Sequence, residues 1–384
     1  MQVKPNYSGG GIVNLMSSIA SAVGTQSPYP ETTIDGLSGV EKSKNIVLMV
    51  VDGLGYDYLM EHGKDTMLAS SVRGTLTSVF PPSTGSAITT FITGLAPQQH
   101  AVTGWYVFLK EYGMMSRILP FTSVVDWNVI DTDIANVVKF KSLFWEIERE
   151  RIVVAGKQIV DSAFSQYTIG RGATRIGYEG IQSFFGSVEK AISLAKKPSY
   201  IYSYWPELDS IAHILGIKSV EAQEHLHVFD HAFNTFMETI EGSDTTLIVT
   251  SDHGLHDVKP ESLIRTGDHP ELMDTLTLPL CGDTRSVYCY VRPSRVREFE
   301  HYVNSELEHA CEIHKSEDLI DDNWFGLYEA HQMLPNRVGD YTLMFNEDYA
   351  VLNSFPGQEP PSLLGHHGGT SSEEMRVPLI VING

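Results

Sequence analysis

Residues 46–55 decide the fold, and their sequence is Ile46-Val47-Leu48-Met49-Val50-Val51-Asp52-Gly53-Leu54-Gly55. A short apolar run that contains β-branched residues and ends at Asp-Gly predicts a buried strand followed by a turn. Asp52 would then stand at the carboxyl end of a central strand, where open α/β sheets bind their ligands. Taken alone, the motif fits a plain turn-forming Asp-Gly equally well.

Similar apolar runs recur along the chain, with helix-like segments between them. They cover residues 152–155, 200–204, 245–250 and 377–382. From Ala222 to Ile240, apolar residues recur at three- and four-residue spacing, which predicts an amphipathic helix. This alternation predicts an α/β fold with a largely parallel central sheet flanked by helices.

Composition divides the chain into three expected parts. Residues 1–40 are rich in Gly, Ser and Pro around one apolar segment and are expected to form an N-terminal arm over the core. From residue 256 to 361 turn signals become frequent, and this segment holds more than half of the net negative charge. We therefore expect a smaller acidic α+β insertion at 256–361, placed before the C-terminal strand of a catalytic core that comprises 41–255 and 362–384.

Charge and cysteine content exclude several classes of function. The 384 residues include 48 acidic and 27 basic side chains, a formal net charge of −21, which disfavours binding to polymeric nucleic acid. Cys281, Cys289 and Cys311 are too few for a disulfide framework and indicate a reducing compartment. Because the N-terminus lacks a signal-peptide pattern and no apolar run reaches the ~18 residues that cross a bilayer, we expect a cytoplasmic protein without membrane contact. Oligomeric state is left open.

A hydroxyl-bearing loop precedes a predicted helix between Phe80 and Gly94. Ser83 or Thr84 would cap the start of that helix, and Gly94 would end it. Unpaired N–H groups and the positive end of the helix dipole favour an anion such as phosphate at this position. An ordinary N-cap is the simpler interpretation of this segment by itself.

Asp and His residues cluster near the ends of three further predicted strands. Asp209 and His213 are four residues apart, so on a helix they share one face and could hold one metal ion. Asp252 and His253 follow another strand, and Gly365-His366-His367-Gly368 precedes the last one. Each of these clusters alone is a modest hint, and pairs such as Asp209 and His213 are common on solvated helices. Together, oxygen and imidazole ligands without thiolate suit two Zn²⁺ or similar divalent ions, which could clamp a phosphoryl group.

The order of these motifs resembles the alkaline phosphatase superfamily, in its nucleotide pyrophosphatase/phosphodiesterase branch, from about Asn45 to the C-terminus. Counting back from Thr93-Gly94-Leu95 identifies Thr84 as the position of that family's nucleophile. The resemblance implies one metal held by Asp52, Thr84, Asp252 and His253. It implies a second metal held by Asp209, His213 and His367, where His367 is preferred to His366 because the family's last His directly precedes Gly.

The resemblance implies a two-metal hydrolase that cleaves phosphodiester or nucleotide pyrophosphate bonds of a small substrate through a phosphothreonine on Thr84. Phosphomonoester or phosphonate hydrolysis at the same site is the alternative, and a non-catalytic metal- or phosphate-binding protein is the rival from another class. One departure affects the expected site. Phosphodiesterase members of the family commonly place an Asn three residues after the nucleophile to hold a phosphate oxygen, and Ala87 stands there.

Overall fold

The computed structural model describes residues 2–346, 348–353, 355 and 362–384. Within these residues, seven strands form a central sheet with the predicted α/β arrangement. In spatial order they are β2 (Val72–Thr77), β18 (Arg376–Asn383), β9 (Thr245–Thr250), β1 (Asn45–Val51), β8 (Ser199–Trp205), β6 (Glu150–Gly156) and β7 (Thr174–Tyr178).

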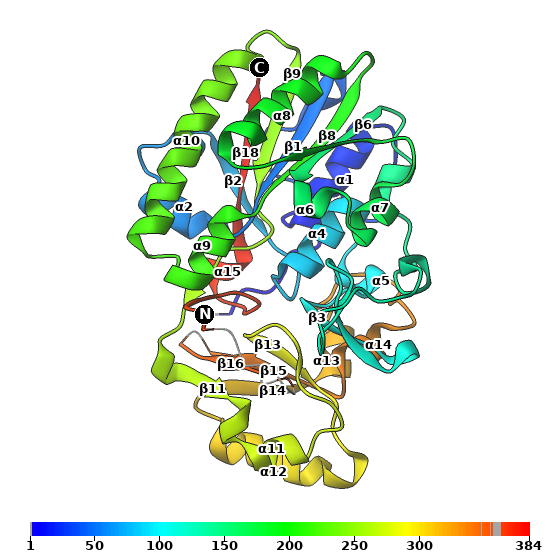
Figure 1. The fold of residues 1–384 in the computed structure, drawn as a ribbon, viewed down its shortest axis with the longest axis vertical. Helices are drawn as coiled ribbons and strands as arrows, with labels where there is room; N and C mark the ends of the chain where they lie inside the picture. The colour runs from blue at the N-terminus through cyan, green and yellow to red at the C-terminus, as the bar shows by residue number, and fades with distance from the viewer. Residues whose placement is uncertain (1, 347, 354, 356–361) are drawn as a thin grey trace.

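The described helices include short and long elements, and Figure 1 shows several of them on the two faces of this sheet. Their bounds are α1 (Ile12–Ala22), α2 (Tyr56–His62), α3 (Met67–Ser70), α4 (Thr84–Thr93), α5 (Pro97–His100), α6 (Lys157–Val160), α7 (Ala163–Ile169), α8 (Ile181–Leu194), α9 (Glu207–Leu215), α10 (Val220–Ile240), α11 (Pro270–Asp274), α12 (Val296–Glu306), α13 (Ser316–Asp321), α14 (Leu334–Val338) and α15 (Ser372–Met375).

Strand β1 lies at the centre of the sheet and is buried along its whole length. Its side chains alternate between two hydrophobic clusters because successive residues of a strand point to opposite faces. Ile46 and Leu48 belong to a cluster that includes residues of α1 and α4. Val47 and Met49 belong to a second cluster, which includes residues of α8 and α10. A strand covered on both faces requires the continuous apolar run seen in its sequence.

Strand direction brings the motif-bearing loops to one edge of the sheet. Strand β1 is parallel to its neighbours β8 and β9, so the segments that follow all three strands meet at that edge. Strand β18 is antiparallel to β9 and therefore starts at the edge where the other strands end. Strand β2 is antiparallel to β18, so the loop toward α4 also leaves from there.

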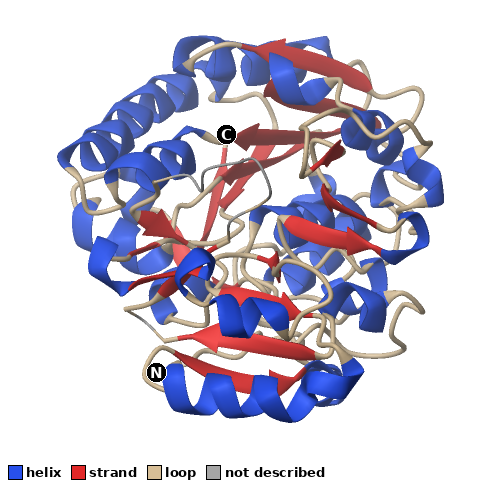
Figure 2. Ribbon diagram, turned by 60° about the horizontal axis from the view of Figure 1, so that its bottom comes forward, coloured by secondary structure: helices blue, strands red, loops and turns tan. Residues whose placement is uncertain are grey.

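A second sheet is antiparallel and lies below the first in Figure 1. In spatial order it contains β14 (Cys311–Lys315), β15 (Tyr341–Phe345), β13 (Ser286–Cys289), β12 (Cys281–Gly282), β3 (Tyr106–Leu109), β4 (Met114–Arg117) and β5 (Thr122–Ser123). Phe299 and Val303 of α12 are fully buried in the same cluster as strand residues of this sheet. Figure 2 brings this end forward and shows helices running beside the strands.

Two short pairs of strands lie outside both seven-stranded sheets and join segments that are distant in sequence. They are β10 (His256–Asp257) with β17 (Gly365–His366), and β11 (Leu263–Arg265) with β16 (Ala350–Leu352). The second sheet contains β3–β5, which the expected division of the chain assigns to the core, beside strands of the expected insertion. The division itself stays a prediction, and its boundary at residue 361 lies outside the described residues.

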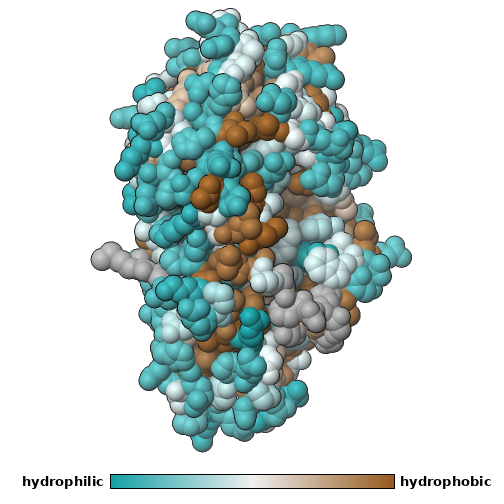
Figure 3. All heavy atoms as spheres, turned by 60° about the vertical axis from the view of Figure 1, so that its left-hand side comes forward, coloured by the Kyte–Doolittle hydropathy of each residue, from teal (hydrophilic) through white to brown (hydrophobic). Residues whose placement is uncertain are grey.

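The face drawn in Figure 3 is mostly hydrophilic, and hydrophobic residues gather in a vertical band near its middle. Among the described residues, no helix combines the length and the apolarity that crossing a membrane requires. Cys281, Cys289 and Cys311 are buried and free.

Candidate active site

Asp52, Asp252 and His253 form the first cluster at the edge of the sheet. Each offers one ligand atom, and these atoms lie within 4.8 Å of one another. The Nε2 atom of His253 is 3.5 Å from Oδ1 of Asp52 and 3.5 Å from Oδ2 of Asp252. The three residues come from the loops after β1 and β9, which are neighbouring parallel strands. The cluster is therefore a direct result of the parallel pairing.

The carboxylate of Asp252 is held in one orientation by hydrogen bonds to a single oxygen. Its Oδ1 accepts the backbone N–H of Gly53 at 3.2 Å, the backbone N–H of His253 at 3.0 Å and the hydroxyl of Ser251 at 3.3 Å. Its Oδ2 is buried and has no hydrogen-bond partner among the described residues. This asymmetry leaves one oxygen of a fixed carboxylate available for a cation.

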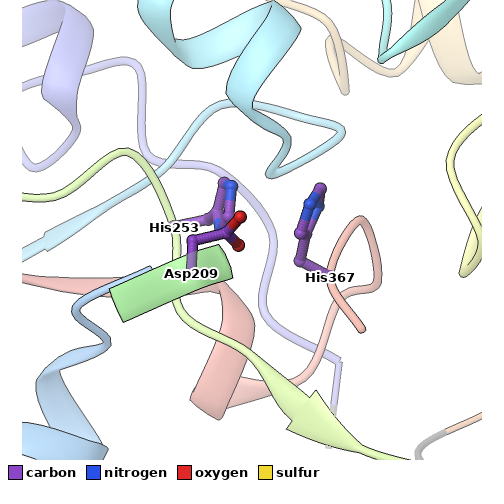
Figure 4. A group of neighbouring side chains, drawn as sticks. All are labelled: Asp209, His253 and His367. Atoms are coloured by element: carbon purple, nitrogen blue, oxygen red, sulfur yellow. The ribbon is translucent and has the colours of Figure 1, made fainter. Parts of the chain in front are cut away.

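A second cluster contains Asp209, His253 and His367, whose ligand atoms also lie within 4.8 Å of one another. Figure 4 shows these side chains approaching from three segments, namely α9, the loop after β9 and the loop before α15. His213 lies one helical turn after Asp209, and its Nε2 is 3.3 Å from Oδ2 of Asp209. The rings of His253 and His367 stack with centroids 3.9 Å apart. His253 thus belongs to both clusters.

Backbone carbonyls orient two of these imidazoles. The Nδ1–H of His213 can donate to the carbonyl of Gly365 at 2.8 Å, and that of His253 to the carbonyl of Gly254 at 3.1 Å. Such bonds place the lone pair on Nε2, the usual second-shell arrangement around metal-binding histidines. Burial, followed by the proximity of the His253 and His213 imidazoles, lowers the pKa of His367 well below its ordinary range. The neighbouring His366 instead contacts the hydroxyl of Thr284 at 2.9 Å.

Thr84 opens α4 with Ser83 as its N-cap, and Gly94 ends the helix in the left-handed conformation. The hydroxyl oxygen of Thr84 is 3.2 Å from Nε2 of His253, so it lies beside the first cluster. Only 8 % of Thr84 is exposed. Ala87, one turn further along the same helix, is fully buried and offers no polar side-chain atom.

The polar atoms of the two clusters fit bound cations. In these two clusters, four buried atoms have no hydrogen-bond partner among the described residues, and they are Asp52 Oδ1, Asp209 Oδ1, Asp252 Oδ2 and His367 Nδ1. Leaving buried carboxylate oxygens unpaired is costly. Burial, followed by the charges of Asp252 and Asp209, raises the pKa of Asp52 well above its ordinary range. A divalent ion at each cluster would reverse this cost, because it favours the ionised carboxylates.

Sequence patterns did not identify two further polar residues at this site. The hydroxyl of Tyr204, near the end of β8, donates to Oδ2 of Asp52. Asp283 lies in a turn-like Cys-Gly-Asp segment, yet its carboxylate accepts the N–H of Trp105 and is 4.0 Å from Nδ1 of His367. Burial raises the pKa of Asp283 to about 6. Both contacts cross between segments that are distant in sequence.

A buried ion pair fixes the loop that carries His367. Glu374 accepts from Nε of Arg285 at 2.9 Å, and it also accepts the N–H of Gly369 and the hydroxyl of Ser371, each at 2.7 Å. Both charged side chains are almost completely buried. Arg285 sits just before β13 of the second sheet, so the pair ties that sheet to the loop.

Comparisons with known proteins agree with this fold. A family model described as type I phosphodiesterase / nucleotide pyrophosphatase matches residues 46–370. Human ectonucleotide pyrophosphatase/phosphodiesterase 5 shares 17% identity and a TM-score of 0.65, with 88% of this chain and 87% of that chain covered. An inactive variant of its murine counterpart in complex with AMP gives 17%, 0.64, and 87% of each chain. Phosphonoacetate hydrolase from Sinorhizobium meliloti in complex with phosphonoacetate gives 16%, 0.63, and coverage of 87% of this chain and 89% of that chain. No curated protein sequence matched.

Proposed function

Since this chain belongs to the type I phosphodiesterase / nucleotide pyrophosphatase family, whose members hydrolyse phosphate esters, we propose that it cleaves phosphodiester or nucleotide pyrophosphate bonds with two bound divalent ions. The observation that carries the proposal is the set of unpaired buried oxygen and nitrogen atoms beside the hydroxyl of Thr84. If these residues had a purely structural role, the free-energy cost of burying these polar atoms without partners would have no explanation.

Thr84 acts as the nucleophile in this proposal. Its Oγ1 forms a bond to phosphorus while the bond from phosphorus to the leaving-group oxygen breaks. The hydroxyl proton of Thr84 is released, the departing oxygen takes up a proton, and the products are a phosphothreonine and a free alcohol or phosphate. A water molecule then attacks phosphorus from the opposite side, the bond to Oγ1 breaks, and Thr84 regains its proton. The start of α4 supports this role, because its N–H groups and dipole favour the negative charge of the phosphoryl group.

Two residue sets would hold the ions. Asp52, Asp252 and His253, together with Thr84, would hold one, while Asp209, His213 and His367 would hold the other. Oxygen and imidazole donors without thiolate suit Zn²⁺. When bound, such ions lower the pKa of the attacking group and neutralise charge on the phosphoryl oxygens. The buried free cysteines support the accompanying proposal of a cytoplasmic location.

The relatives suggest two substrate classes. The murine structure contains AMP, which supports a nucleotide-containing diester or pyrophosphate. The bacterial hydrolase is described with phosphonoacetate, which supports phosphonate hydrolysis as the second candidate. Phosphomonoester hydrolysis would use the same residues.

The proposal is tested by comparing bis(4-nitrophenyl) phosphate, 4-nitrophenyl phosphate and phosphonoacetate as substrates of the purified protein. We expect the diester to be hydrolysed fastest, the activity to disappear with a chelator, and Zn²⁺ to restore it. Faster hydrolysis of the monoester or the phosphonate would favour the corresponding alternative. If none of the three compounds is hydrolysed after Zn²⁺ addition, the result would favour a non-catalytic metal- or phosphate-binding protein.

Tyr204→Phe should weaken metal binding by about 10- to 100-fold, the usual effect of removing a second-shell hydrogen bond. The phenol donates to Oδ2 of Asp52, and burial raises the pKa of Tyr204 well above its ordinary range, so it remains a donor. Competition with a chromophoric chelator measures the affinity. Tyr200→Phe is the matched control, because that hydroxyl lies on the same strand, is buried and has no partner among the described residues. Equal affinities in the two variants would contradict a positioning role for Tyr204.

A further inference from the structure

Residues 2–11 lie outside the span 46–370 that the family model matches. We call them the N-terminal strap. Tyr7 of the strap is only 4% exposed, and Gly11 forms a β-bridge with Thr77 at the end of β2. The strap is therefore part of the packed fold, and its position requires an explanation of its own.

Two side chains of the strap contact the region of the second sheet. The side-chain amide of Gln2 donates to Oε2 of Glu312, on β14, at 3.0 Å. The ammonium group of Lys4 donates to the carbonyl of Asp322 at 2.5 Å. Asp322 is the C-cap of α13, the helix that follows β14 along the chain. These contacts attach the strap to the second sheet and to the helix after it.

Two backbone groups of the strap contact the core beside the candidate site. The N–H of Val3 donates to the carbonyl of Thr370 at 2.7 Å, in the loop that also carries His367. The N–H of Asn6 donates to Oγ1 of Thr77 at 2.8 Å. Because β2 leads into the loop before α4, the strap contacts both a metal-ligand loop and the strand that leads to the proposed nucleophile.

The hydroxyl of Tyr7 joins the strap to residues 78–83, which precede Thr84 and which we call the nucleophile loop. It accepts the backbone N–H of Phe80 at 3.3 Å and donates to the carbonyl of Trp324 at 2.8 Å. Burial raises the pKa of Tyr7 well above its ordinary range, so the phenol keeps the proton that it donates. The rings of Phe80 and Trp324 also pack edge to face, with centroids 5.1 Å apart. One buried hydroxyl therefore links the strap, the nucleophile loop and the segment after α13.

The nucleophile loop depends on partners outside itself. Two of its residues are proline and have no backbone N–H. Ser78 anchors its first end, because its N–H donates to the carbonyl of Met375 at 2.7 Å and its hydroxyl donates to the carbonyl of Asp252. The N–H of Phe80 anchors its middle, and the acceptor is Tyr7. Loss of the phenol hydroxyl would leave a buried N–H without its partner, which favours movement of the loop.

The strap does not contact the space where substrate would bind. A cavity of about 790 Å³ is lined by Asp52, Thr84 and His367, so it opens onto the proposed reacting groups. None of the described residues of the strap lines this cavity. An effect of the strap on turnover would therefore act through the position of Thr84 rather than through lost contacts with substrate.

We propose that the N-terminal strap positions the nucleophile, with Tyr7 as the positioning residue that holds the nucleophile loop through its hydroxyl. The inference rests on the proposed function, because that function makes Thr84 the nucleophile. Thr84 lies four residues after Phe80. A shift of the loop would therefore change the distance and angle at which Oγ1 meets phosphorus, and a displacement of ~1 Å can lower a rate by about 10²-fold.

Tyr7→Phe should lower kcat and kcat/KM for bis(4-nitrophenyl) phosphate by the same factor, about tenfold, because it disturbs only the geometry of the reaction. Tyr29→Phe is the matched control. The hydroxyl of Tyr29 also accepts a backbone N–H, that of Leu327 at 3.0 Å, and it donates to Oε1 of Gln99 at 2.6 Å, so both partners lie outside the nucleophile loop.

Both variants should lose similar amounts of thermal stability, whereas only Tyr7→Phe should lose turnover when the rates are compared at equal metal content. A wild-type kcat in folded Tyr7→Phe, or equal losses of kcat in the two variants, would overturn the inference.

Gly11→Ala provides a second variant, because it displaces the strap without removing a hydroxyl. A Cβ atom at Gly11 would collide with the backbone carbonyl oxygen of Asn6, the residue before Tyr7, so the strap itself must shift. Gly186→Ala is its control, because a Cβ atom there would meet no atom of the described residues within 4 Å. Gly11→Ala should lower kcat and Gly186→Ala should not. An unchanged kcat in folded Gly11→Ala would also overturn the inference.

Hydrogen–deuterium exchange of the purified protein separates this inference from the proposed function, because it requires no turnover. Peptides that cover residues 78–84 should exchange faster in Tyr7→Phe and Gly11→Ala than in the wild type, since local opening exposes their N–H groups. Tyr29→Phe should leave their exchange unchanged. Faster exchange in a protein that hydrolyses no ester would support positioning of the loop by the strap and overturn the proposed function alone. Unchanged exchange of these peptides in both strap variants would overturn the inference even in an active enzyme.

Discussion

Thr84→Ala should lower kcat/KM for bis(4-nitrophenyl) phosphate by at least about 10³-fold, because it removes the side-chain oxygen proposed to attack phosphorus in the first step. The hydroxyl is 3.2 Å from His253 and 8 % of Thr84 is exposed, so a water molecule that replaces it would have neither its position nor its covalent step. Nitrophenolate release measures the rate. Metal content, measured in the same samples, shows whether the ligand clusters survive the substitution.

Two further variants make this result specific. Thr84→Ser keeps a hydroxyl at the start of α4 and should retain part of the activity, as well as a phosphoryl adduct that mass spectrometry can detect after acid quenching. Thr93→Ala removes a buried threonine hydroxyl from the other end of the same helix, where it donates to the carbonyl of Thr89, and serves as the control. Wild-type turnover by Thr84→Ala would remove Thr84 from the chemistry.

Five strands of the central sheet were predictable because they are short, largely buried and apolar, which is a local property of the sequence, whereas the partly exposed edge strands β2 and β7 were not predicted. The run at 46–51 corresponds to β1 (Asn45–Val51), and the run at 245–250 coincides with β9. The spacing from Ala222 to Ile240 lies within α10, whose N-cap Ser219 sets its start earlier than the apolar pattern did. Local patterns thus located elements to within a few residues.

The second sheet was less predictable because its pairing is long-range. Gly282 of β12 pairs with Tyr106 of β3, so two segments far apart in sequence form one sheet. Short, mixed strands carry little information about such partners, since register depends on which faces are buried in the finished fold. The prediction of an acidic insertion at 256–361 followed composition, which carries no information about pairing with the strands at 106–123.

Parallel topology explains why the candidate site could be anticipated as a group. Residues that directly follow parallel neighbouring strands must meet at one edge, so Asp52 and Asp252 converge whatever the side-chain details are. Tyr204 and Asp283 were missed as site residues because their roles depend on side-chain direction across tertiary contacts.

Asp209→Ala should reduce the metal content of the protein from two ions toward one per chain. The substitution removes a carboxylate whose Oδ1 is buried without a partner and whose Oδ2 is 3.3 Å from His213, leaving only imidazoles for the second ion. The remaining imidazole ligands carry no negative charge, so they cannot offset the charge of a buried divalent ion as the carboxylate of Asp209 does. Elemental analysis after dialysis measures the stoichiometry, and Asp161→Ala removes an exposed carboxylate that pairs with Arg175 and controls for net charge. His367→Ala should have the same effect as Asp209→Ala, whereas two tightly held ions in either variant would place that residue outside the ligand set.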